Sequence, residues 1–162
     1  MITIRARAAE DNAQLADIWL RSVRATHHFL TEDNIAQLFP LVLNDYLPAV
    51  NVWVAEERPG HPCGFIGLNG NKVEMLFIDA DQRGKGVGKR LLQWMNDYAA
   101  GQGAGRCRSL HVSRRNVDAL RLYRRCGFQV RREEHYAALG WLFGQPDWVL
   151  MERRCGEATC AK

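Results

Sequence analysis

Glycine and cationic residues alternate in the segment best suited to bind an anion. Gly84, Gly86 and Gly88 follow the strand-like run Val73–Ile78 and open the helix-like run Val87–Ala99. Glycine lets the backbone approach a ligand and adopt positive φ, and a helix N-terminus presents N–H groups without helical partners. The pattern therefore predicts an anion cradle, and phosphate is an anion that such cradles hold. Four cations surround it: Arg83, Lys85, Lys89 and Arg90.

Two well-known phosphate motifs do not fit this segment. A G-x-x-x-x-G-K-[ST] loop ending at Gly88-Lys89 would need glycine at 83 and Ser or Thr at 90, where the chain has arginines. A G-x-G-x-x-G loop from Gly84 would need glycine at 89 and would follow the first strand. The pattern that remains, R-x-x-G-x-G, resembles the acetyl-CoA pyrophosphate loop of the GNAT (GCN5-related) N-acetyltransferases. The alternative is a glycine-rich turn with solvated charges.

A second segment resembles the same family independently. Asn116–Phe128 matches the signature N-x-x-A-x-x-L-Y-x-x-x-G-F. Asn116 is a good N-cap, Asp118 suits the first turn of a helix, and Gly127 is a natural helix stop. The alternative is an ordinary short amphipathic helix.

Hydrophobic periodicity and turn residues predict an alternation of strands and helices. Strands are expected over 2–6, 50–56, 63–68, 72–78, 108–112, 128–132 and 148–152, and helices over 12–23, 32–39, 41–47, 87–99 and 116–126. Asp11, with Gln14 as a capping-box partner, is expected to start the first helix and Thr31 the second, with Pro40 limiting the latter.

This order is the GNAT order, and the resemblance covers about residues 2–153. It implies an α/β (α+β) fold, the GNAT acyl-CoA N-acyltransferase fold, with a mixed, mostly antiparallel sheet and helices on both faces. The strands over Val73–Ile78 and Arg108–Val112 would run parallel and splay apart, and the gap would receive the pantetheine arm.

The resemblance also implies cofactor contacts and a catalytic acid. Tyr123 matches the family tyrosine that donates a proton to the CoA sulfur. The donor to the thioester oxygen is expected to be a backbone N–H at Phe77 or Ile78, where the strand would bulge. The predicted cofactor-binding residues are Leu76, Phe77, Ile78, Arg83, Gly84, Lys85, Gly86, Val87, Gly88, Lys89, Asn116 and Tyr123.

Two residues compete for the role of general base. His111 stands where some family members have a glutamate base, and imidazole can accept a proton near neutral pH. Glu74 lies on the neighbouring strand, where many members place an acid that works through water, and strand alternation puts it on the face of Leu76 and Ile78. A satisfied polar strand residue is the alternative for each.

The GNAT resemblance implies that the stretch Arg21–Leu30 walls the acceptor site. Its pattern R-S-V-x-A-T-H-x-F-L is similar to that of a subgroup of small bacterial single-domain acetyltransferases. His27, His28 and Phe29 are predicted substrate contacts, and the histidines could instead cap a helix end. No metal is implied, because adjacent residues of a helix point in different directions.

Composition predicts one domain over residues 1–154 and a polar, disordered tail over 155–162. The chain has 162 residues, 47% of them hydrophobic and 25% charged, which is ordinary for a globular protein. Its N-terminus has no signal-peptide pattern and no run approaches the ~20 apolar residues of a membrane span, so a cytoplasmic protein without membrane association is expected. The five cysteines form no C-x-x-C pair, and Cys63, Cys107 and Cys126 are expected to be buried apolar groups.

Net charge is +4, and arginines gather over Arg106–Arg132. Such a cluster could bind nucleic acid, but aromatic platform residues do not accompany it. We favour the CoA phosphates as its partner, with Arg114 and Arg115 facing the 3′-phosphate.

The leading hypothesis is an acetyl-CoA-dependent N-acetyltransferase that moves the acetyl group directly to a primary amine in a ternary complex. The acceptor is a small molecule or a protein amine, and pairing into a homodimer is compatible with the family. The main alternative is a non-catalytic CoA-binding regulator or partner-binding protein. A weaker one is an RNA-associated enzyme that modifies aminoacyl-tRNA.

Overall fold

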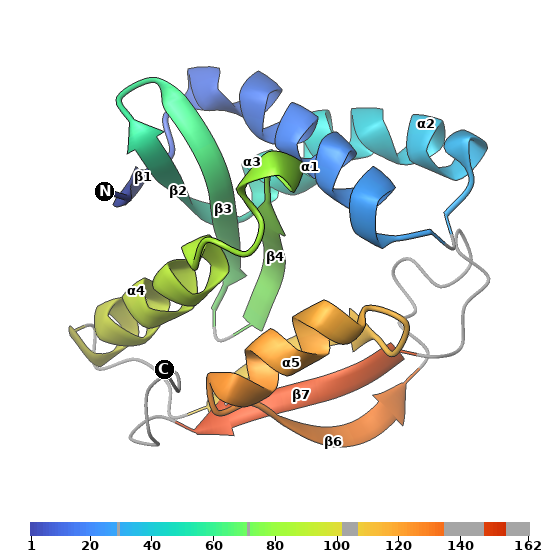
Figure 1. Cartoon of the computed structure of the whole chain (residues 1–162), viewed down its shortest axis with the longest axis vertical. Coiled ribbons are helices and arrows are strands. Elements are labelled where there is room, and N and C mark those ends of the chain that lie inside the picture. The colour runs from blue at the N-terminus through green and yellow to red at the C-terminus, as the bar shows by residue number, and fades with distance from the viewer. Residues whose placement is uncertain (29, 71, 102–106, 135–147, 155–162) are drawn as a thin grey trace.

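The chain is built on one mixed sheet with helices against both of its faces (Figure 1). The computed structural model describes residues 1–28, 30–70, 72–101, 107–134 and 148–154. Phe29 and the predicted tail over 155–162 lie outside the described residues, so the predicted substrate contact and the tail stay predictions.

Seven strands form the sheet in the order β1-β2-β3-β4-β5-β7-β6. Every neighbouring pair is antiparallel except β4 and β5, which run parallel. This confirms the predicted mixed, mostly antiparallel sheet. The strands are β1 (Thr3–Ala6), β2 (Asn51–Arg58), β3 (His61–Asn69), β4 (Lys72–Ile78), β5 (Cys107–Ser113), β6 (Gln129–Glu134) and β7 (Trp148–Arg154).

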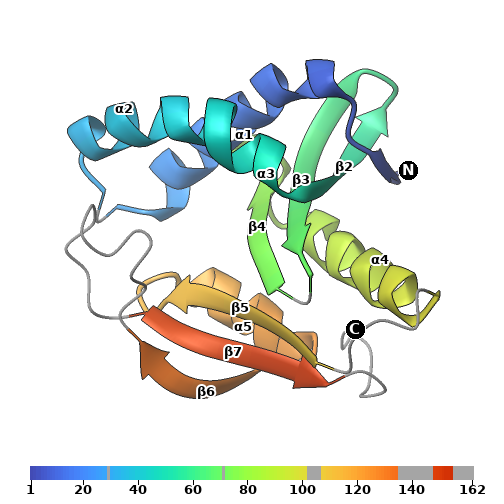
Figure 2. The same ribbon diagram turned by 180° about the vertical axis from the view of Figure 1, so that it is seen from behind.

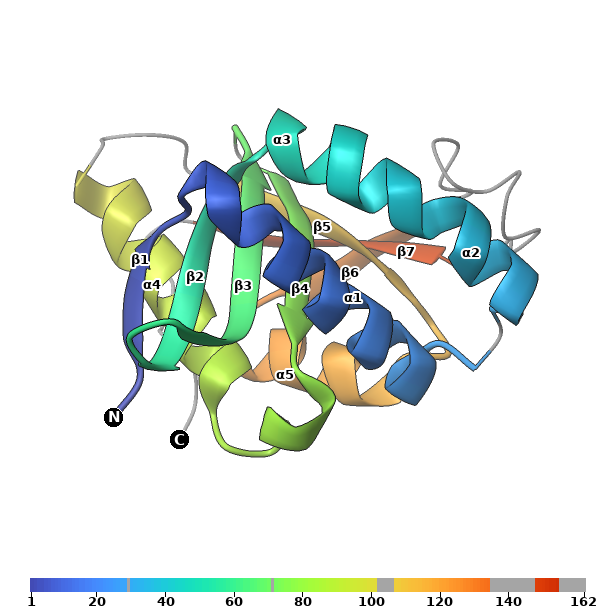
Figure 3. The same cartoon turned by 90° about the horizontal axis from the view of Figure 1, so that it is seen from above.

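The helices divide between the two faces, as Figure 3 shows with α1 in front of the sheet and α4 and α5 behind it. They are α1 (Asn12–Thr26), α2 (Glu32–Leu41), α3 (Leu47–Ala49), α4 (Val87–Gly101) and α5 (Val117–Arg125). One core lies between α1, α2 and the sheet and includes Leu15, Leu38 and Phe65. The other lies under α4 and α5 and includes Leu91 and Phe128. Each face of the sheet therefore has its own buried layer.

The starts of the first two helices differ in how they are capped. Thr31 Oγ1 accepts the N–H of Asn34 at 3.0 Å, and Asn34 Oδ1 accepts the N–H of Thr31, so the predicted cap of α2 is confirmed. Asp11 occupies the N-cap of α1 as predicted, but its side chain does not cap the helix. Its carboxylate instead binds Arg5 at 2.7 Å and 2.9 Å, so the expected capping box with Gln14 is wrong.

Pro40 does not end α2, contrary to expectation. It lies inside the helix, and the chain continues as a π-helical segment over Val42–Tyr46 before α3. The Val42 N–H reaches the carbonyls of Leu38 and Phe39, so the backbone stays hydrogen-bonded past the proline that lacks a donor.

A bulge interrupts β4 at Glu74. Leu68 faces Val73 and Gly67 faces Met75 across the β3–β4 pair, so Glu74 is the extra residue. The bulge explains why Val73 packs under α4 and α5 whereas Met75 packs under α1 and α2. Strict alternation would place both on one face. The expected bulge at Phe77 or Ile78 therefore lies earlier, and the expectation that Glu74 shares a face with Leu76 and Ile78 fails.

The parallel pair β4–β5 is short and then opens. Only Lys72–Ser109 and Val73–Leu110 are paired. Beyond them the strands diverge, and in Figures 1 and 2 the strands β5, β7 and β6 turn away from β1–β4. This confirms the predicted splay of the two strands.

Cys63 and Cys126 differ in their bonding. Cys63 is a free buried thiol, as expected. Cys126 is buried as expected, but it is disulfide-bonded. Among the described residues, no helix is long and apolar enough to span a bilayer.

Candidate active site

A cavity of about 1020 Å³ occupies the opening between β4 and β5 and extends to both faces of the sheet. On one side it is lined by the glycine loop and α5, and on the other by α1, α2 and the π-helical segment. The predicted cofactor residues that line it are Leu76, Phe77, Ile78, Arg83, Gly84, Gly86, Val87, Gly88, Lys89, Asn116 and Tyr123. Lys85 does not line it, and its Nζ lies 3.4 Å from Gln82 Oε1.

The glycine loop has the conformation that its sequence predicts. Gly84 and Gly86 have φ of 79° and 83°, and a Cβ on either would meet no atom within 4 Å. The Gly86 carbonyl accepts the Arg90 N–H at 3.0 Å, so the first turn of α4 begins here. The N–H groups of that turn have no helical partner. An open cradle of backbone donors fits the diphosphate of acetyl-CoA.

Gly88 allows two helices to pack closely. A Cβ there would lie 2.9 Å from Leu122 Cδ2, so its absence lets α4 approach α5.

Asn116, the predicted cap of α5, accepts the Ala119 N–H at 3.3 Å.

Two ion pairs that the sequence did not predict hold the loop. Arg21 binds both oxygens of Asp79, at 2.8 Å and 2.9 Å, and so ties α1 to the residue that follows β4. Arg83 Nη2 lies 3.1 Å from Asp118 Oδ2, which connects the loop to α5. Both pairs join segments far apart in sequence, so no local pattern could reveal them.

Backbone groups of β4 face the opening in alternation. The Asp79 N–H donates to Cys63 O at 2.9 Å. In an antiparallel pair every second residue directs its N–H to the partner strand, so Phe77 directs its N–H to β3. Leu76 and Ile78 consequently direct theirs to the opening. Of the two expected thioester donors, Phe77 is excluded by this geometry.

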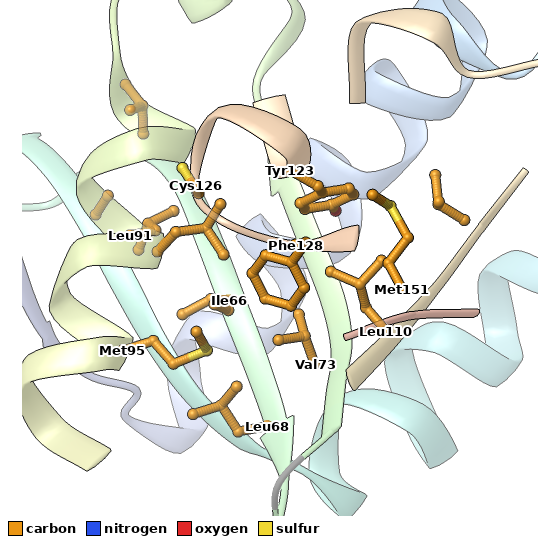
Figure 4. Close-up of a cluster of buried hydrophobic side chains, with 14 of the residues drawn as sticks. Ile66, Leu68, Val73, Leu91, Met95, Leu110, Tyr123, Cys126, Phe128 and Met151 are labelled. Carbon is orange, nitrogen blue, oxygen red and sulfur yellow. The ribbon is translucent and has the colours of Figure 1, made fainter. Parts of the chain in front are cut away.

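Tyr123 lies at the inner wall of the cavity. Figure 4 shows its ring beside Phe128, and the two centroids are 5.8 Å apart in an edge-on arrangement. The side chain is buried, and burial raises the pKa of the phenol. Tyr123 therefore stays protonated through the physiological range.

Both candidate bases lie where β4 and β5 part. Val73 pairs with Leu110, so Glu74 and His111 are the next residues along each strand, and both line the cavity. Leu110 and Val112 belong to the core under α4 and α5, so alternation turns His111 to the α1–α2 side. Lys72 Nζ lies 3.6 Å from Glu74 Oε1, a pair that the sequence did not suggest.

The α1–α2 side of the cavity is largely apolar. Its lining includes Trp19, Val23, Leu38 and Met75, and one of the predicted histidines, His27. Burial, helped by repulsion from His28 and Arg83, lowers the pKa of His27 to about 4. His27 is therefore neutral at physiological pH.

Of the other predicted substrate contacts, His28 is exposed and does not line the cavity. The arginine cluster also divides. Arg114 and Arg115 are absent from the cavity lining, where Arg121 and Arg125 occur instead, and Arg114 pairs with Glu133. The expected orientation of Arg114 and Arg115 to the cofactor is not supported.

Comparison with known proteins gives the class of protein. A family model described as "Acetyltransferase (GNAT) domain" matches residues 48–130. The chain belongs to the GNAT family of acetyltransferases, as the two motifs predicted.

Relatives over nearly the whole chain refine this assignment. The peptidyl-lysine N-acetyltransferase YjaB of Salmonella typhimurium is 38% identical over 140 residues, which cover 86% of this chain and 92% of YjaB. The solution structure of apo YjaB from Escherichia coli superposes with a TM-score of 0.78 at 32% identity, covering 98% of this chain and 99% of that one. The chain is an N-acetyltransferase.

Structures with bound cofactor share the fold. The PaiA N-acetyltransferase of Thermoplasma acidophilum, solved with coenzyme A, has a TM-score of 0.77 at 21% identity over 95% of this chain and 99% of that one. Acetyl-CoA is the cosubstrate of this family, and the glycine cradle and the opening between β4 and β5 fit it.

Proposed function

We propose that this enzyme transfers the acetyl group of acetyl-CoA directly to the side-chain amine of a lysine in a peptide or protein. The observation that carries the proposal is the point where β4 and β5 part. There Glu74 and His111 lie between the cofactor cradle on one side and an apolar half-cavity on the other.

The apolar half-cavity supports a lysine acceptor. A lysine side chain has an apolar stem of four carbons and a charged tip, which suits a cavity lined by Trp19 and Met75 as well as by the carboxylate of Glu74. A polyamine would carry further ammonium groups into this lining, and burying an unpaired charge is costly. Relatives named as peptidyl-lysine N-acetyltransferases, at 38% and 35% identity, support the same choice.

The chain's own residues then divide the proton transfers. Acetyl-CoA supplies the activated acetyl thioester. Glu74 holds the acceptor ammonium, as it holds that of Lys72, and takes one proton so that the amine can attack. His111 lies beside it and orients the amine. Tyr123 donates a proton to the departing sulfur, because its buried phenol remains protonated.

The backbone of β4 would stabilise the thioester oxygen. Leu76 and Ile78 both direct N–H groups to the opening, and Leu76 is nearer its closed end. We therefore assign the oxygen to the Leu76 N–H and a pantetheine amide to Ile78. A preorganised donor of this kind stabilises developing negative charge.

The proposal is tested with acetyl-CoA and three acceptors, by following thiol release. The first is a peptide with one lysine and a blocked N-terminus, the second is the same peptide with norleucine, and the third is spermidine. We expect release with the lysine peptide alone. Turnover of spermidine without turnover of the lysine peptide would overturn the acceptor assignment.

Variants of the two candidate bases assign the proton acceptor. We expect Glu74→Gln to lower kcat at least about 100-fold. His111→Gln should mainly raise the KM of the peptide. The reverse pattern would make His111 the base.

A further inference from the structure

Lys72 places an amine of the chain itself at the point where the acceptor amine is expected. It is the first residue of β4 and pairs with Ser109 immediately before the two strands part. Its side chain is 26% exposed, lines the cavity, and brings Nζ to 3.6 Å from Glu74 Oε1. Val73 packs under α4 and α5, so Lys72 before it faces the α1–α2 side, and the ion pair brings Glu74 to the same side.

The Lys72 side chain has the chemistry of the acceptor that the proposed function requires. Lys72 carries a primary amine on a four-carbon stem, which is the acceptor assigned above. It occupies the same carboxylate that would take the acceptor's proton. Holding an amine beside its base within one molecule replaces a bimolecular encounter by an intramolecular one, and this raises the effective concentration greatly.

We propose that Lys72 is a site of self-acetylation, in which the enzyme acetylates its own cavity lysine within one molecule. This inference rests on the proposed function, because it uses the same base and the same acid.

The step balances without any further reactant. A C–N bond forms between Nζ and the acetyl carbonyl carbon, and the C–S bond of the thioester breaks. The ammonium loses two protons. One leaves through Glu74 to solvent, and the second is matched by the proton that Tyr123 gives to the CoA sulfur and then recovers. The product amide carries no charge, so it can no longer form the ion pair with Glu74.

Lys85 provides an internal control for simple chemical acetylation. It is exposed, belongs to the glycine loop and does not line the cavity. A small acylating reagent such as acetic anhydride should prefer exposed Lys85 to partly buried Lys72. Acetylation directed by the active site should reverse this preference.

The test incubates the wild-type protein with acetyl-CoA and without acceptor, and maps the acetyl groups by peptide mass spectrometry. We expect Lys72 to be acetylated before Lys85, with a first-order rate constant that is unchanged on tenfold dilution of the protein. The Glu74→Gln variant should slow Lys72 acetylation at least about 10-fold while leaving Lys85 unchanged. In the anhydride control, Lys85 should react first.

Different failures separate the two proposals. If the lysine peptide is acetylated but Lys72 reacts no faster than Lys85, self-acetylation is overturned and the proposed function stands. A first-order rate constant that rises in proportion to protein concentration overturns the intramolecular step. If neither the peptide nor Lys72 is acetylated although acetyl-CoA binds, both proposals are overturned.

Discussion

Removal of the Tyr123 hydroxyl tests the chemistry with the least disturbance of the fold. Tyr123→Phe keeps the ring that packs against Phe128 at 5.8 Å and deletes one oxygen. An ordinary phenol has a pKa of ~10 and a thiol ~8.5, so complete proton transfer to the sulfur is uphill by about 2 kcal/mol. Burial raises the pKa of Tyr123 and adds to that difference. The proton must therefore move as the C–S bond breaks, when the sulfur is most basic.

The expected loss follows from this role. A general acid contributes about 100-fold or more to the rate, so kcat of Tyr123→Phe should fall about 100-fold, which is about 2.7 kcal/mol. The KM of acetyl-CoA should change little, because the ring still lines the cavity. Steady-state kinetics with the lysine peptide measures both constants. Tyr98→Phe, which deletes the hydroxyl of a 39% exposed tyrosine on α4, is the matched control.

The pH profile adds an independent criterion. Because burial raises the pKa of Tyr123 above the ordinary ~10, its ionisation should not lower the wild-type rate below about pH 10. A fall in kcat between pH 8 and 9 that disappears in Tyr123→Phe would refute this reasoning. An unchanged kcat in the variant would remove Tyr123 from the acid role altogether.

Three further changes probe the cradle, its ion pair and the fold. Gly86→Asp should weaken CoA binding at least about 100-fold, as measured by calorimetry. The new carboxylate repels the diphosphate, and a side chain in the left-handed backbone conformation of Gly86 costs about 1 kcal/mol. Gly70→Asp, also at positive φ, is the control and should bind CoA normally. Asp118→Asn should tighten CoA binding about threefold at low salt by releasing the loop arginine, and equal affinities of variant and wild type there would contradict this. Arg5→Met should cost about 2 kcal/mol of unfolding free energy at pH 7. The Arg5 guanidinium lowers the pKa of Asp11 in the folded state, so the stabilisation from this ion pair is lost as the pH falls through the folded pKa. The difference in unfolding free energy between variant and wild type, measured by urea melts, should therefore shrink below about pH 4.

Local signals explain why so much of the fold was predictable. The glycine loop needs positive φ at Gly84 and Gly86, and few other residues accept it, so the sequence records the conformation directly. Asn116 likewise predicts the start of α5 within one residue, because its side chain accepts a backbone N–H there. Such features are encoded in a few neighbouring residues.

The errors arise where distant contacts override a local pattern. Asp11 is a good capping residue by type, yet Arg5 takes its carboxylate. The bulge at Glu74 leaves no mark in the apolar pattern of β4, because both residues beside it are apolar and merely face opposite layers. The position of the candidate base relative to the two faces could therefore not be predicted from alternation.

The bulge and the short parallel pair together explain how a continuous sheet comes to contain a binding site. After Val73 the edge of β4 has no partner in β5, although the sheet continues on both sides. Unpaired backbone groups in a protein interior cost about 1–3 kcal/mol each. The N–H groups of Leu76 and Ile78 are therefore best satisfied by a ligand that carries amides of its own, as the pantetheine arm does. The bulge meanwhile turns Glu74 to the opposite face from Leu76. In the proposed function, one irregular strand thus separates the cofactor side from the acceptor side, and the two meet where β4 and β5 part.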